Sequence, residues 1–173
     1  SIRLKPGGTK RYRFEVHVPK DAADGECRFA IVISPAPETV DTMAFGNFKF
    51  PISGSIAVIV YVTVGKAKPN LEFKGVYLKQ GNGYRAPVIR FTNTGNAHAR
   101  PFGSVMVRDA SGKRAELIAV PFPILPDRTW DIELVADPET SGVKSIKELN
   151  YPLQLRGLIE WDGGTHKIDN KVK

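Results

Sequence analysis

The chain has little of what builds disulfides, metal sites and membrane-spanning helices. Its 173 residues include one cysteine and three histidines. A single cysteine excludes an intrachain disulfide and a thiolate metal site. The longest apolar run lies within Ser55–Gly65 and is about half the length that a membrane-spanning helix needs. These absences exclude a disulfide scaffold and a helical membrane span.

Residue types used in catalysis are present, but they do not occur in recognisable catalytic combinations. The three histidines, His17, His98 and His166, lie far apart, and no pair has metal-ligand spacing with a nearby carboxylate. Asp162 precedes His166, but Asp162-Gly-Gly is first of all a turn signal. No serine, cysteine or threonine comes with a recognisable set of partner residues. We therefore expect no enzyme activity, no metal and no cofactor.

Positive charge exceeds negative charge, but it is spread along the chain. Lysine and arginine number 25 against 18 acidic residues, a formal net charge of +7. The densest clusters are Arg3 and Lys5 with Lys10–Arg13, and Lys66 with Lys68. Neither cluster alternates with several aromatic residues, as binders of single-stranded nucleic acid do. We interpret the charge as a means of meeting an acidic partner protein, not a nucleic acid.

Helical periodicity is almost absent, and its best candidate, Ser141–Asn150, is short and is followed by Pro152. The strongest strand signal is Ser55–Val64. Both faces of this strand are apolar, so we expect cover on both sides. One face carries Ile56, Val58, Val60, Val62 and Val64, and the other carries Ala57, Ile59, Tyr61 and Thr63.

The first part of the chain supplies few strands. Alternation predicts strands at Lys10–Val18 and Cys27–Ser34 besides Ser55–Val64, with Pro35–Pro51 as a long connection. We expect Cys27, at the start of its strand, to be a buried small side chain. These strands are too few for a closed sandwich, so the missing ones were trimmed or are donated by another molecule. An edge left open in this way allows pairing with a partner or with a second copy.

After Lys66–Asn70, which reads as a polar linker, the strand pattern restarts. Explicit turn signals separate the segments, among them Asn93–Asn96, Asp109–Lys113 and Asp162–Gly164. Seven strands are the number expected of an immunoglobulin-like sandwich. The predicted strands are Leu71–Leu78, Ala86–Phe91, Gly103–Arg108, Ala115–Val120, Thr129–Val135, Leu153–Trp161 and Thr165–Ile168.

The predicted fold is therefore all-β, with two immunoglobulin-like β-sandwich domains in tandem and the first incomplete. Residues 1–65 form the first domain, 66–70 the linker and 71–173 the second domain. Trp130 and Trp161 are predicted as core or rim aromatics of the sandwich, and carbohydrate binding through either is a further hypothesis.

The order of elements in residues 10–80 resembles the periplasmic pilus-assembly chaperones of the PapD type. The turn and strand of Val18–Ile33, the loop of Pro35–Gly54 and the apolar strand Ser55–Val64 carry the resemblance. That family has two immunoglobulin-like domains and binds subunits in the periplasm. It anchors a subunit's terminal carboxylate with an arginine and a lysine, whereas Ser55–Val64 carries no lysine, and Lys49 and Lys66 only flank it.

The resemblance implies a non-enzymatic protein of the periplasm or cell envelope that binds partner subunits by strand pairing. The alternative is a structural immunoglobulin-like scaffold or adhesion module of an envelope assembly. In strand pairing, backbone hydrogen bonds give affinity and alternate side chains give specificity. The predicted partner-binding residues are Ile56, Val58, Val60 and Val62 as the inserted row, with Lys66 and Lys68 beside them.

Overall fold

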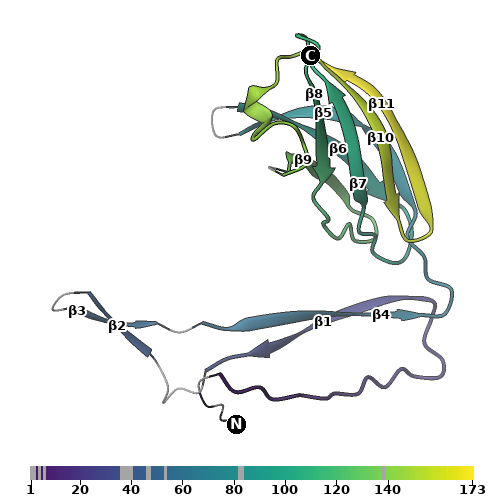
Figure 1. The fold of residues 1–173 in the computed structure, drawn as a ribbon. Coiled ribbons are helices and arrows are strands. Elements are labelled where there is room, and N and C mark those ends of the chain that lie inside the picture. Colours follow the sequence, from purple (N-terminus) through teal and green to yellow (C-terminus); the bar gives the residue numbers. More distant parts are fainter. Residues whose placement is uncertain are drawn as a thin grey trace. The chain divides into compact units, whose positions relative to one another are not determined.

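The computed structural model describes residues 3, 5, 7–35, 41–45, 48–52, 54–81, 84–137 and 139–173. The chain divides into two compact units (Figure 1). The first unit comprises Ser1–Ala23 and Cys27–Val64, and the second comprises Asp24–Glu26 and Gly65–Lys173.

Strands dominate both units, which confirms the prediction of an all-β chain. Among the described residues, the one helical element is a short 3-10 turn, η2 (Ile146–Glu148). In the described part of the chain, no helix has the length and apolar character needed to cross a membrane.

The second unit is a single seven-stranded sheet in the order β11-β10-β7-β8-β9-β6-β5. All of its neighbouring strands are antiparallel. A strand is present at each of the seven predicted segments, because alternating side chains and explicit turns define them locally. The strands are β5 (Leu71–Gly81), β6 (Tyr84–Asn93), β7 (Phe102–Arg108), β8 (Arg114–Ala119), β9 (Thr129–Ala136), β10 (Leu153–Trp161) and β11 (Gly164–Val172).

This sheet curls around one hydrophobic core (Figure 1). The curl brings its two edge strands together: the ring of Phe73 on β5 stacks on the ring of His166 on β11, with 4.2 Å between centroids. Phe91, from β6, is fully buried and packs edge-on against Phe73 and Trp161. Burying a large apolar side chain contributes about 1.5–3 kcal/mol, so this core stabilises the second unit by itself.

The predicted turns form where their residue types require. Trp161 pairs with Gly164 across the two-residue turn between β10 and β11, and Gly163 takes the positive φ of 86° that this turn needs. The best helix candidate of the sequence, Ser141–Asn150, contains only the short turn η2. Gly142 has a φ of 75°, outside the helical region, and the side chain of Ser145 caps the short turn by accepting from the backbone N–H of Lys147.

The segment 66–70 is fixed to the turn that follows β6. The backbone N–H of Lys68 donates to the side-chain oxygen of Asn96 at 2.9 Å, and the N–H of Asn96 donates to the carbonyl of Lys68 at 3.1 Å. A Cβ added to Gly95 would lie 2.3 Å from that carbonyl oxygen, so only glycine permits this close approach. These residues are therefore part of the second unit's folded body.

The described residues of the first unit form two separate two-stranded sheets. β1 (Gly25–Ile33) pairs with β4 (Ile56–Val64), and the two run in opposite directions (Figure 1). β2 (Asp41–Phe45) and β3 (Phe48–Ile52) form an antiparallel hairpin.

Two predictions for this unit are wrong. Residues 10–18 form no strand, because no neighbouring strand among the described residues offers them a ladder. The connection Pro35–Pro51 is not only a loop, since it contains β2 and most of β3. In the sequence, the dipeptide Gly-Asn between Phe45 and Phe48 is of a type that signals a hairpin.

Candidate partner-binding surface

The first unit has no core of its own among the residues whose burial is described. Among the residues whose burial is described, every buried hydrophobic residue lies at Leu71 or later, within the second unit. A two-stranded ribbon is marginally stable by itself, and three or more strands with a covered apolar face are needed for independent stability. The β1–β4 ribbon therefore exposes surface that a stable fold covers.

The predicted row of β4 lies on this ribbon. The side chains of Ile56 and Val58 are 67% and 49% exposed, and Val60 and Val62 are half-buried. Alternate residues of a strand share one face, so these four form a continuous apolar row. On the opposite face, Ile59 is 58% exposed.

Within the described residues, the cover expected on both faces of Ser55–Val64 is missing at Ile56, Val58 and Ile59, which are exposed. β4 pairs with β1 alone, and no other described strand pairs with its second edge. Cover must come from strands and a facing layer, and the described residues of the first unit supply too few. The same shortage explains why Cys27, predicted to be buried, is exposed on β1.

Exposed apolar side chains continue from β4 onto its neighbours. Phe29, Val32 and Ile33 of β1 are exposed. Scattered single apolar residues on a surface are normal, but a contiguous set marks an interaction site. The extended segment before β1 adds four more, at Tyr12, Phe14, Val16 and Val18.

The two predicted binding lysines belong to the second unit. Lys66 and Lys68 are both exposed, and Lys68 is held through its backbone while its side chain is left to solvent. The structure thus presents both cations at the surface on a fixed stretch of chain. The other predicted basic cluster is also exposed at each of its residues, Arg3, Lys5, Lys10, Arg11 and Arg13.

A polar contact that the sequence did not reveal joins Glu26 to His98 within the second unit. The side chain of Glu26 is only 4% exposed. One of its oxygens lies 2.6 Å from Nδ1 of His98, and the other accepts from the backbone N–H of His98 at 3.1 Å. No local pattern links these residues, which are 72 positions apart.

The two tryptophans have different surroundings. Trp161 packs against the core beside Phe91, as predicted for a sandwich aromatic. Trp130 is 46% exposed and stacks on Phe122, with centroids 4.5 Å apart. This pair lines a surface cavity of about 330 Å³ together with Lys79 and Glu133, which hold each other in an ion pair.

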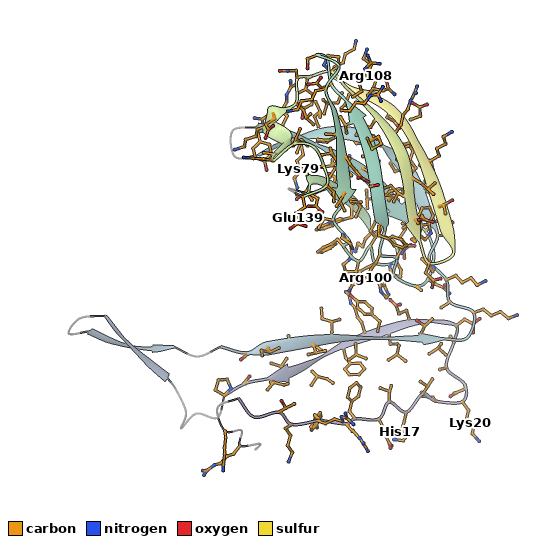
Figure 2. The ribbon with its side chains drawn as sticks, viewed as in Figure 1. His17, Lys20, Lys79, Arg100, Arg108 and Glu139 are labelled. Atoms are coloured by element: carbon orange, nitrogen blue, oxygen red, sulfur yellow. The ribbon has the colours of Figure 1, made fainter. Side chains whose placement is uncertain are left out.

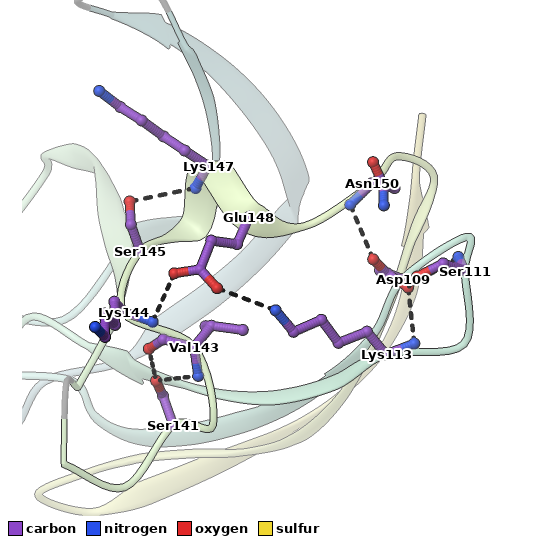
Figure 3. A network of polar contacts seen from close by, with 10 residues as sticks. All are labelled: Asp109, Ser111, Lys113, Ser141, Val143, Lys144, Ser145, Lys147, Glu148 and Asn150. Carbon is purple, nitrogen blue, oxygen red and sulfur yellow. Dashed lines mark hydrogen bonds and ion pairs between the residues drawn. The ribbon is translucent and has the colours of Figure 1, made fainter.

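The polar networks of the second unit hold loops in place. Asp109 accepts hydrogen bonds from the backbone N–H groups of Ser111, Lys113 and Asn150, and from the Ser111 hydroxyl (Figure 3). The Asn150 bond is the largest cause that lowers the pKa of Asp109 to about 2. In the same region, the carboxylate of Glu148 accepts hydrogen bonds from Nζ of Lys113 and from the backbone N–H of Lys144.

Further titratable groups of the second unit make pairwise contacts on its strands. Arg90 binds Asp131 through two hydrogen bonds, which lower the pKa of Asp131, but both lie on a sheet face. Burial lowers the pKa of His166, whose ring is stacked on Phe73. Among the described residues, no three metal-ligating side chains come together. In the first unit, the described residues with exposed apolar side chains lie on β1, on β4 and in the segment 12–18.

Comparison of the chain with protein-family models, with curated proteins and with solved structures finds no match.

Proposed function

We propose that this chain is a non-enzymatic binding protein that takes up partner subunits by strand pairing at β4. The observation that carries the proposal is that β4 has a strand neighbour on one edge only among the described residues, while its apolar row is exposed. An edge strand offers a row of backbone N–H and C=O groups to another chain. A partner strand there forms a ladder, and Ile56 and Val58 enter its apolar pockets.

The energetics favour this occupant over solvent. Apolar burial contributes about 25 cal/mol per Å² of surface removed from water, and the ribbon leaves apolar residues exposed on both faces of β4. Binding by strand addition combines that burial with new backbone hydrogen bonds. A permanent scaffold, the alternative, is favoured by a β4 paired on both sides, which the described residues do not provide.

Strand order supports the proposal that the second unit is immunoglobulin-like. Its strands group as β11-β10-β7 and β9-β6-β5, with β8 joining the groups. Labelled A to G in chain order, these groups are the GFC and EBA strands of such a sandwich. We extend the same interpretation to β1 and β4, as the last two strands of a first domain. The kinship with PapD-type chaperones and the periplasmic or envelope location come from the resemblance of element order alone.

A fluorescent dodecapeptide that alternates valine with serine tests the proposal, with a block-scrambled peptide of the same composition beside it. Fluorescence anisotropy on the full chain is expected to show binding of the alternating peptide only. The double variant Ile56→Asp/Val58→Asp is expected to weaken binding by about tenfold or more, because an apolar partner row would bury unpaired carboxylates.

The matched control is Met106→Asp, on β7 of the second unit, where the native side chain is 51% exposed. It is expected to leave peptide binding unchanged. Equal binding of both peptides, no binding of either, or equal loss in the control variant would each overturn the proposal. Because both tryptophans lie in the second unit, their fluorescence verifies that this unit stays folded in every variant.

A further inference from the structure

Residues 10–18 have the sequence of a strand without the pairing of one. Apolar residues alternate with polar ones from Lys10 to Val18, and the segment runs extended beside β1 (Figure 1). The flanking backbone hydrogen bonds are local turns, from Gly8 to Lys5 and from Ala22 to Pro19. Within the described residues, 10–18 make no backbone–backbone hydrogen bond of their own. No described strand therefore uses their ladder groups.

The segment meets β1 through side chains. The ring of Phe14 packs edge-to-face on the ring of Phe29, with centroids 6.3 Å apart. Figure 2 draws the side chains of this segment and labels His17. Contact through side chains, without a ladder, is the relation between two facing layers of a sandwich and not between neighbours in one sheet. By the period of two, Tyr12, Val16 and Val18 share the face of Phe14. Residues 10–18 therefore form part of a second layer opposite β1.

The opposite face of the segment is charged and mainly basic. It carries Arg11, Arg13, Glu15 and His17. Glu15 lies 3.5 Å from His17, whereas Arg11 and Arg13 make no ion pair with any described residue. The sequence before Glu15 adds further cations at Arg3, Lys5 and Lys10 and contains no acidic residue.

We propose that residues 10–18 are a second strand-binding edge, and that they take up an extended segment of a partner protein whose outward residues are acidic. The proposal rests on the proposed function, which it deepens by naming a second edge and the partner's chemistry. The partner strand places its apolar row in the layer that faces β1. Its acidic residues stand across from Arg11 and Arg13.

Charge complementarity selects this occupant. Opposite charges directly across two strands stabilise the pair by about 0.2–1 kcal/mol, and like charges destabilise it. Pairing with a second copy would bring the five cations of one segment, Arg3 to Arg13, beside five more. An acidic strand neutralises them instead. Steering by these charges also raises the association rate at low salt.

The experiment uses three alternating dodecapeptides that share valine at every second position and carry glutamate, serine or lysine between. We expect the full chain to bind the glutamate peptide about tenfold or more tightly than the lysine peptide at low salt. The double variant Arg11→Ser/Arg13→Ser is expected to reduce that preference at least threefold. The control Lys167→Ser/Lys171→Ser removes the same charge from exposed positions of β11 and is expected to keep the preference.

Amide hydrogen exchange followed by NMR locates the bound peptide. Protection gained by the amides of residues 11–17 supports the proposal. Binding that protects only β4, with no preference for glutamate, overturns this inference and leaves the proposed function standing. No binding of any peptide overturns both. Sedimentation that shows a dimer with residues 11–17 already protected overturns it as well, because a second copy is then the occupant.

Discussion

The carboxylate of Glu26 contacts His98 at two points. One oxygen lies 2.6 Å from the ring Nδ1, and the other accepts a hydrogen bond from the backbone N–H of His98 at 3.1 Å. Glu26 stands near the start of β1, and His98 follows the turn after β6. The contact therefore ties Asp24–Glu26 to the body of the second unit, to which these residues belong.

Glu26→Ala is expected to lower the free energy of unfolding of the second unit by about 1–3 kcal/mol, because it leaves the backbone N–H of His98 without its acceptor. Glu26→Gln keeps an oxygen for that N–H and is expected to lose less. Urea unfolding followed by tryptophan fluorescence measures both variants. An Ala variant with the native unfolding midpoint would show that the contact contributes nothing.

Asp109 is expected to make stability depend on pH in a defined window. Its pKa is lowered to about 2 in the folded chain, chiefly by the hydrogen bond from the backbone of Asn150. A lowered pKa means that the unfolded chain binds the proton more readily. The stabilisation is therefore complete above the ordinary aspartate pKa and is lost as the pH falls toward 2.

Urea midpoints measured between pH 5 and pH 2 test this expectation against Asp109→Asn, which cannot ionise. Glu148 and Asp131 also have lowered pKa values, so both proteins lose stability in acid. The difference between native chain and variant is expected to shrink as the pH falls through this window. A difference in stability that stays constant with pH would mean that the charge of Asp109 does not contribute and that only its size and hydrogen-bonding shape matter.

Val60→Asp is expected to abolish capture of the alternating peptide. Val60 is half-buried on β4, in the row with Val58 and Val62, so a carboxylate there is left unpaired when a partner strand covers it. Tryptophan fluorescence of the second unit is expected to be unchanged. Native stability together with native peptide binding would refute the role of this row.

Lys66 and Lys68 are expected to steer the partner and not to hold it. Exposed ion pairs contribute about 0–1 kcal/mol each, so their main effect falls on association. Lys66→Ser/Lys68→Ser is expected to slow the on-rate of the glutamate peptide and to flatten its salt dependence, with little change in the off-rate. Surface plasmon resonance at low and high salt measures both rates. An on-rate that responds to neither change would leave these lysines as solvated surface.

Local signals predicted the second unit well. Alternation over each segment, and turns such as Asp162-Gly163, fix strand positions without knowledge of the neighbours. The best helix candidate, Ser141–Asn150, forms only a short turn for a local reason, since Gly142 has a φ outside the helical region.

The first unit was harder to predict because pairing and burial depend on what stands beside a strand. Residues 10–18 have the alternating pattern of a strand but pair with no described strand, and Cys27, which has the character of a core residue, is exposed. The contact of Glu26 with His98 joins residues 72 positions apart, so no local sequence motif could predict it. Alternation did identify the row of β4, whose exposure only the structure could reveal.

Residue-resolved hydrogen exchange of β4 is the most direct test of the claim that its outer edge takes up a strand. Alternate amides of a strand point to opposite edges. In the chain alone, every second amide of Ile56–Val64 is expected to be protected by β1 while the others exchange rapidly. Adding the alternating peptide is expected to protect this second set. Protection of both sets in the monomeric chain alone, or no gain on saturation with peptide, would contradict the account.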